Sequence, residues 1–259
     1  MDARLLLQHV TGWTREQLLA HPDWQVGPTE LRTCQALVAR RAASEPVAYL
    51  IGEREFYGRN FRVDRRALIP RPETELLVEI GIAAVDRLRA LGIEPTLVDV
   101  GTGCGAIAVS LSLERALHVV STDVSWEALS LARENAHMFG ADVAFVQADL
   151  LNGLRGPFNV VLANLPYVPS TRDLPADVRD YEPHMAIFGG RRGTELIERF
   201  LVEAKPLLSE GAQLAVELDE EEQATPVAAL ARQLYPCAEV SICQDAGGYD
   251  RVVSLRLAG

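Results

Sequence analysis

The spacing of hydrophobic and polar positions changes near residue 70, and the chain before that point has a helical pattern. Apolar residues recur at helical spacing over residues 5–10. Thr14 and Gln17 then stand three positions apart ahead of an apolar pair, which is the capping-box signature of a helix start. We therefore expect short amphipathic helices in this region.

Two further helices and a hairpin complete this first part. Residues 29–41 place apolar side chains on one stripe of a helix, and Pro46 is a typical opening residue of another. Residues 55–64 alternate apolar and polar side chains around a glycine and an asparagine, which predicts a β-hairpin. We expect a small helical domain over residues 1–54 and a hairpin connector over residues 55–72.

From residue 73 onwards, predicted helices and strands alternate. Apolar runs predict strands at residues 96–100, 118–123, 143–149, 158–165, 212–218, 238–244 and 251–257. Strands that alternate with helices form mostly parallel sheets that are covered on both faces. We expect one α/β domain over residues 73–259. Since the last two strands lie close together in the sequence, we also expect a reversed strand at the sheet edge.

The composition fits a globular protein of the cytoplasm. Hydrophobic residues make up 48% and charged residues 24% of the 259 residues, the usual balance of a globular domain. No apolar run is long enough to cross a bilayer, and the first residues lack the basic start and apolar stretch of a signal peptide. The four cysteines are scattered and have no histidine at zinc-ligand spacing, so we expect reduced thiols and no metal site.

The formal net charge of −11 disfavours a nucleic-acid partner. Proteins that bind duplexes draw much of their affinity from phosphate neutralisation and tend to carry a basic face. Arginines do cluster at Arg62, Arg65, Arg66 and Arg71, which leaves a local basic patch open. On balance we expect no direct contact with nucleic acid or membrane, and a monomeric chain.

A glycine loop after the first strand of the α/β domain is the strongest cofactor signal. It consists of Gly101, Thr102, Gly103, Cys104 and Gly105. Alternating glycines let the backbone turn sharply and let a ligand approach without meeting Cβ atoms. Asp123 ends the next strand, where an open α/β sheet places the carboxylate that binds ribose hydroxyls, and Asp149 has a similar position after the third strand. The spacing differs from the dinucleotide fingerprint and resembles motif I of the Rossmann-like methyltransferases, which bind S-adenosyl-L-methionine.

The second signal is a tetrapeptide at the end of the fourth strand, where ligands bind in such sheets. It consists of Asn164, Leu165, Pro166 and Tyr167. The lone pair of a planar –NH2 group is delocalised, so acceptors for both N–H groups are needed to hold the nitrogen in line with a methyl donor. Asn164 offers its side-chain oxygen and Leu165 its backbone carbonyl. Pro166 stiffens the turn, and the Tyr167 ring can lie against the amide or the sulfonium.

Three more segments carry a family resemblance, at residues 46–50 (PVAYL), 52–56 (GEREF) and 68–75 (LIPRPETE). Together with the tetrapeptide, they resemble the peptide chain release factor glutamine methyltransferases, the HemK-like family. The resemblance implies a helical N-terminal domain that helps dock a release factor, followed by a Rossmann-like methyltransferase domain. It implies methyl transfer from S-adenosyl-L-methionine to N5 of the glutamine in a Gly-Gly-Gln motif.

The same resemblance assigns roles to the two signals. The cofactor would be bound by the glycine loop, Asp123, Asp149, Leu150 and Asn164, and the glutamine by residues 164–167. Three positions depart from the family pattern. Leu165 stands where proline is usual, Cys104 where threonine or serine is common, and Leu150 where a large aromatic residue is often found near the adenine.

Other functions stay open at this point. A similar –NH2 group is presented by a ribosomal-protein glutamine or by adenine N6 in nucleic acid, although a base would have to be extracted first. The chain could also be a binding module that has lost transfer, which the intact Asn164, Pro166 and Tyr167 disfavour. Arg71 and Glu73 either line the site or belong to the connector, and we expect Glu182 to order a loop.

Overall fold

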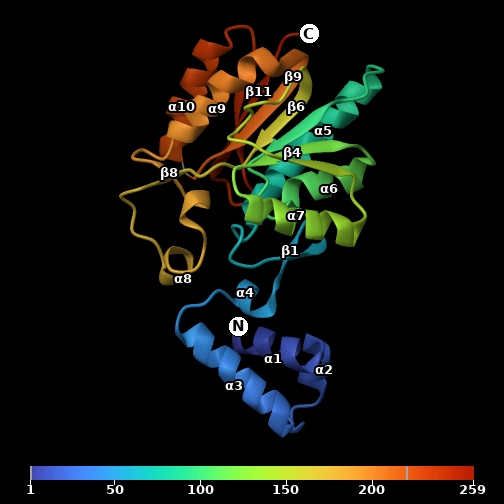
Figure 1. Ribbon diagram of the computed structural model, residues 1–259, viewed down its shortest axis with the longest axis vertical. Helices are drawn as coiled ribbons and strands as arrows, with labels where there is room; N and C mark the ends of the chain where they lie inside the picture. Colours follow the sequence, from blue (N-terminus) through green and yellow to red (C-terminus); the bar gives the residue numbers. More distant parts are fainter. Residues whose placement is uncertain (1, 220) are drawn as a thin grey trace.

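The computed structural model describes residues 2–219 and 221–259 and consists of a small helical part below an α/β body (Figure 1). The helical part contains α1 (Asp2–Thr11), α2 (Arg15–Ala20), α3 (Pro28–Ala42) and α4 (Val47–Ile51). The predicted capping box is present, since the side chains of Thr14 and Gln17 each accept a hydrogen bond from the other's backbone N–H. Leu6, Leu37 and Leu50 form a small core of their own.

The predicted hairpin consists of β1 (Glu53–Phe56) and β2 (Arg59–Arg62), paired antiparallel. Phe56 and Phe61 are fully buried and pack into the same hydrophobic cluster as the helices of the α/β body. The hairpin is therefore attached to the body, and Figure 1 shows β1 between the body and the N-terminal helices. The boundary that we expected after residue 54 lies inside β1, and the domain limits stay a prediction.

A seven-stranded sheet forms the centre of the body, in the order β10-β11-β9-β6-β3-β4-β5. Its strands are β3 (Leu97–Val100), β4 (Val119–Asp123), β5 (Val143–Gln147), β6 (Phe158–Ala163), β9 (Leu208–Glu217), β10 (Glu239–Gln244) and β11 (Asp250–Arg256). Five neighbouring strands, from β9 to β5, run parallel. The reversed strand that we expected at the edge is β11, and it lies one position inside the edge because it pairs with both β9 and β10.

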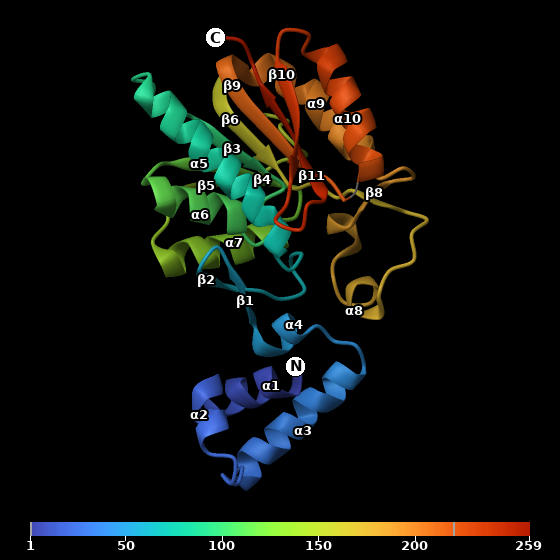
Figure 2. The ribbon, with the colours of Figure 1, turned by 180° about the vertical axis from the view of Figure 1, so that it is seen from behind.

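Helices cover both faces of this sheet (Figure 2). One face carries α5 (Glu75–Ala90), α6 (Ala106–Arg115) and α7 (Trp126–Phe139), and the other carries α9 (Glu195–Ala204) and α10 (Glu221–Leu234). The burial of strand β3 explains why its sequence is apolar at every position except Asp99. Leu97 belongs to the first hydrophobic cluster, whereas Val98 and Val100 belong to the second. A central parallel strand is buried on both faces.

Short elements complete the chain around the carboxyl edge of the sheet. They are η1 (Pro72–Thr74), β7 (Val168–Pro169), α8 (Ala176–Arg179), η2 (His184–Ala186) and β8 (Phe188–Gly190). A further short element, η3 (Lys205–Leu207), directly precedes β9 at the opposite edge. The segment between β7 and β8 reaches the helical part, where the Tyr181 hydroxyl donates to the Ala43 carbonyl at 2.7 Å. No helix in the described part of the chain has the length and apolar character to span a membrane.

Candidate functional site

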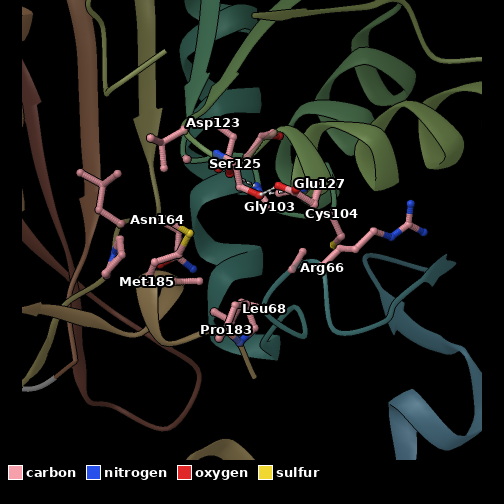
Figure 3. Close-up of a pocket in the computed structure, with 18 of the residues that line it drawn as sticks. Arg66, Leu68, Gly103, Cys104, Asp123, Ser125, Glu127, Asn164, Pro183 and Met185 are labelled. Atoms are coloured by element: carbon pink, nitrogen blue, oxygen red, sulfur yellow. Dashed lines mark hydrogen bonds between the residues drawn. The ribbon is translucent and has the colours of Figure 1, made fainter. Parts of the chain in front are cut away.

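A cavity of about 740 Å³ opens where the parallel strands β3, β4, β5 and β6 end (Figure 3). The residues that follow each of these strands contribute to its wall, and the connector and the β7–β8 segment close the remaining sides. The lining includes Gly101, Thr102, Gly103, Cys104, Asp123, Ser125, Asp149, Leu150, Asn164, Leu165 and Pro166. Residues at the ends of four parallel strands thus meet at the place where open α/β sheets bind ligands.

The glycine loop is fixed by the strand beside it. The backbone N–H groups of Gly101 and Thr102 both donate to the Thr122 carbonyl at 2.9 Å. Gly105 has a positive φ of 86°, and a Cβ atom there would lie 3.1 Å from Cβ of Ala132. Glycine at this position therefore allows both the turn and the close approach of α6 to α7.

Asp123, the residue after Thr122 in β4, also holds the glycine loop. Its Oδ2 accepts a hydrogen bond from the Gly103 N–H and its Oδ1 one from the Ser125 N–H, each at 2.9 Å. Burial raises the pKa of Asp123, and the N–H groups of Ser125 and Gly103 act against this rise. A carboxylate oxygen can accept more than one hydrogen bond, so the side chain can still accept ligand hydroxyls from the cavity.

Asn135 is a buried support that the sequence did not reveal. Its Nδ2 donates to the Cys104 carbonyl at 2.8 Å, and its Oδ1 accepts from the Arg62 N–H at 2.9 Å. The side chain therefore ties the glycine loop to the hairpin. An asparagine within a predicted helix gives no sign of such contacts, because both partners are backbone atoms distant in the sequence.

The Asn164 side chain is oriented by η1. Its Nδ2 donates to Oγ1 of Thr74 at 3.0 Å, and Thr74 is 4% exposed at the end of η1. Because the –NH2 end of Asn164 is engaged, its side-chain oxygen is the end that remains for a ligand. Figure 3 shows Asn164 beside Met185 and separated from the guanidinium of Arg66.

The three residues after Asn164 have different surroundings. Leu165 and Pro166 line the cavity, and a Cβ atom at Gly101 would lie 3.1 Å from Cδ2 of Leu165, so the turn packs on the glycine loop. Tyr167 does not occur among the described residues that line the cavity. Its hydroxyl donates to Oε1 of Glu217 at 3.2 Å, and its ring packs against the cluster on the α9–α10 face. This placement does not bring the ring to the cavity.

Asp149 and Leu150, the two predicted residues after β5, also line the cavity, but they differ in exposure. Asp149 is exposed and forms an ion pair with Arg199. Leu150 is buried, and its carbonyl accepts a hydrogen bond from the Thr122 hydroxyl at 3.0 Å. An apolar wall at Leu150 and a carboxylate at Asp149 therefore border the same end of the cavity. Asp99, two residues before Gly101, is fully buried in β3, and burial raises the pKa of its carboxyl to about 7.

Arg71 belongs to the connector. Its guanidinium donates to Oε1 of Glu182 at 2.6 Å, and Oε2 of Glu182 accepts from the Ile69 N–H at 3.0 Å. The Glu182 side chain is 2% exposed. Neither Arg71 nor Glu73 occurs among the described residues that line the cavity. Glu182 therefore orders the connector, as the sequence suggested, with a partner that the sequence did not identify.

Glu182→Ala is expected to lower the free energy of unfolding by about 1–3 kcal/mol, because it leaves a buried N–H without an acceptor. Urea unfolding measures this change. Glu94→Ala is the matched control, since it breaks an exposed pair in which Arg89 donates at 2.6 Å, and exposed pairs contribute little. Equal midpoints for the two variants would contradict the role given to Glu182.

Comparisons with known proteins agree with this geometry. Residues 1–52 match the PrmC N-terminal domain and residues 82–176 match the methyltransferase small domain. A release factor glutamine methyltransferase of Deinococcus radiodurans is 39% identical over 263 residues, covering 100% of this chain and 91% of the relative.

Two solved structures are also similar. One is the E. cuniculi Mtq2–Trm112 complex, responsible for the methylation of the eRF1 translation termination factor. The match has 25% identity and a TM-score of 0.51, and covers 74% of this chain and 99% of that one. The other is the T. thermophilus 16S rRNA methyltransferase RsmC in complex with AdoMet and guanosine, with 14% identity, a TM-score of 0.55, and coverage of 79% and 49%. The second likeness shows the fold alone.

Proposed function

This chain belongs to the family of release factor glutamine methyltransferases, and we propose that it transfers a methyl group from S-adenosylmethionine to the side-chain amide nitrogen of a release factor glutamine. The observation that carries the proposal is the position of Asn164. Its –NH2 end is held by Thr74, and its oxygen is left to accept a hydrogen bond at a cavity bordered by the glycine loop.

The cavity has the features that the cofactor requires. Its volume of about 740 Å³ lies within the range of small-molecule sites. A Cβ atom at Gly103 would meet nothing closer than 4.0 Å, so the loop leaves room for a ligand against its backbone. We assign the ribose hydroxyls to Asp123 and the adenine to the wall at Leu150. When bound, the cofactor supplies the electrophilic methyl group.

The residues of this chain position the amide that receives the methyl group. The Asn164 oxygen and the Leu165 carbonyl are two acceptors for the two N–H groups of the glutamine, and together they fix the direction of its nitrogen. Leu165 in place of proline does not alter this chemistry, because the acceptor there is a backbone carbonyl. Its contact with the glycine loop instead keeps the turn close to the cofactor.

The charge distribution favours a protein substrate over nucleic acid. Each of the four clustered arginines faces a carboxylate within 4.0 Å, which reduces the basic patch that the sequence left open. The pairs are Arg62–Glu134, Arg65–Glu45, Arg66–Glu134 and Arg71–Glu182. Paired guanidinium groups on a chain of net charge −11 give little of the phosphate neutralisation that binding to nucleic acid needs.

Mass spectrometry tests the proposed function. The protein is incubated with a release factor and S-adenosylmethionine, and the Gly-Gly-Gln peptide is then mapped. We expect one methyl group on the glutamine and none on a release factor whose glutamine is replaced by alanine. Transfer to a ribosomal protein or to adenine, without transfer to the release factor, would overturn the substrate assignment.

Asp123→Asn is expected to raise the Kd for S-adenosylmethionine at least about tenfold. It removes the charged acceptor for the ligand hydroxyls, and a hydrogen bond to a charged group contributes about 1.5–3 kcal/mol. Calorimetric titration measures this change. Asp142→Ala, at an exposed aspartate paired with His118, is the control and should bind like the wild type. An unchanged Kd for Asp123→Asn would remove this residue from the cofactor site.

A further inference from the structure

Glu217 is a buried carboxyl group that the proposed reaction has not used. It ends strand β9, beside β6 in the sheet, and is fully buried. Its Oε1 accepts a hydrogen bond from the Tyr167 hydroxyl at 3.2 Å. Its Oε2 has no hydrogen-bond partner among the described residues. Burying a carboxyl group without full pairing is costly, so its presence behind the Asn164 turn calls for a functional reason.

Thr74 connects this carboxyl group to Asn164. Its Oγ1 accepts a hydrogen bond from Nδ2 of Asn164, and Asn164 and Glu217 directly follow the paired residues Ala163 of β6 and Val216 of β9. Burial raises the pKa of Glu217, and the nearby Thr74 side chain acts against this rise. A threonine hydroxyl has one proton to donate. Because its oxygen already accepts from Asn164, that proton is available to the carboxylate.

We propose that Glu217 is a positioning residue for methyl transfer, which fixes the direction of the Thr74 hydroxyl and thereby keeps the Asn164 oxygen turned to the substrate amide. The inference rests on the proposed function. An ionised carboxylate only accepts hydrogen bonds, so Thr74 donates to it and stays an acceptor for the Asn164 –NH2 group. The Tyr167 hydroxyl, which donates to Oε1 of the same carboxylate, holds Glu217 in place.

Protonation of Glu217 would weaken this arrangement. A neutral carboxyl group is also a donor, so it can donate to Thr74, whose proton then turns to the Asn164 side chain. The Asn164 amide is in that case favoured in the flipped orientation, which presents –NH2 instead of oxygen to the cavity. The substrate N–H groups lose one of their two acceptors.

The surroundings place this change near neutral pH. Burial raises the pKa of Glu217 to about 7, while hydrogen bonding by Thr74 and Tyr167 and the positive charge of Arg251 on β11 act against the rise. Glu73 on η1 raises it further. Asp219 lies in the loop after β9 and acts on Tyr167. Burial raises the pKa of the Tyr167 hydroxyl, and the negative charges of Glu217 and Asp219 raise it further. Ionisation, and with it the productive orientation, is therefore gained as the pH rises through about 7.

The test compares wild type and Glu217→Gln over pH 5.5 to 8.5, with kcat and KM for a release factor measured below the melting temperature of both proteins. The neutral amide of the variant resembles the protonated acid. We expect kcat of the variant to be about tenfold lower at pH 8.5 and to converge on the wild type at pH 5.5, with KM nearly unchanged. A ratio that stays constant with pH would overturn the inference.

A second variant tests the connection through Thr74. Thr74→Val removes the hydroxyl and should lower kcat as Glu217→Gln does, and Thr74→Ser should recover part of the loss. Because the residues act as one unit, the double variant should lose little more than either single one. Independent losses that multiply would overturn the inference. Failure of the wild type to methylate any release factor would instead overturn the proposed function.

Discussion

Asn164→Ala is expected to lower the rate of methyl transfer by about 10²- to 10³-fold, the usual loss when one group that stabilises a transition state is removed. The variant loses the acceptor that holds one N–H of the glutamine, so its nitrogen no longer points steadily at the methyl group. The Leu165 carbonyl alone leaves rotation about the remaining hydrogen bond. Single-turnover transfer to a release factor, with radiolabelled S-adenosylmethionine, measures the change directly.

Binding separates this effect from a collapse of the site. The glycine loop is held by Thr122 and Asp123, whereas the Asn164 side chain is hydrogen-bonded to Thr74, so the variant should keep most of its affinity for S-adenosylmethionine. Asn60→Ala changes an exposed asparagine of the hairpin and should transfer like the wild type. A transfer rate for Asn164→Ala close to that of the control would mean that the methyl acceptor is held elsewhere.

Much of the fold was predictable because the chain has strong local signals. Short segments of the sequence are enough to predict the capping box at Thr14 and Gln17, the hairpin and the alternation of helices with strands. The position of β11 was not predictable from such segments. Two strands that are consecutive in the sequence can pair with either of them at the edge of the sheet. The pairing of β11 with β9 places β11 inside the edge, and it is a contact between residues about forty positions apart.

The site was predictable to a similar depth. Residues that follow strands β3 to β6 converge because parallel strands end at one edge, so spacing predicted that the glycine loop, Asp123 and Asn164 would line one cavity. The side chains that orient them were not. Thr74, Asn135 and Glu217 contact their partners across 31 to 90 positions, at places where a threonine, asparagine or glutamate has no local signature. Tyr167 is the opposite case. Its motif suggested a contact with the ligand, whereas in the fold its hydroxyl donates to Glu217.

Gly189→Ala is expected to lower the free energy of unfolding by about 3 kcal/mol, at the upper end of the usual cost of overpacking, and to impair transfer as well. A Cβ atom at Gly189 would lie 2.2 Å from the Pro166 carbonyl oxygen and 2.4 Å from that of Gly193. Both obstacles are backbone atoms, so no side-chain rotation relieves the overlap. Urea unfolding gives the stability, and transfer is measured at a temperature where the variant is folded.

Gly153→Ala separates the overlap from the general effect of losing a glycine. Gly153 has a positive φ of 83° and nothing within 4 Å of a Cβ atom, so only the conformational cost of about 1–2 kcal/mol applies. Gly189 lies in β8, behind the turn that carries Asn164, and relief of its overlap must move the Pro166 carbonyl. Transfer by Gly189→Ala should therefore fall even when the protein is folded, while Gly153→Ala keeps its activity. If the two variants lose the same stability, β8 does not support the turn as closely as these distances require, and the precision of the Asn164 acceptor must come from Thr74 alone.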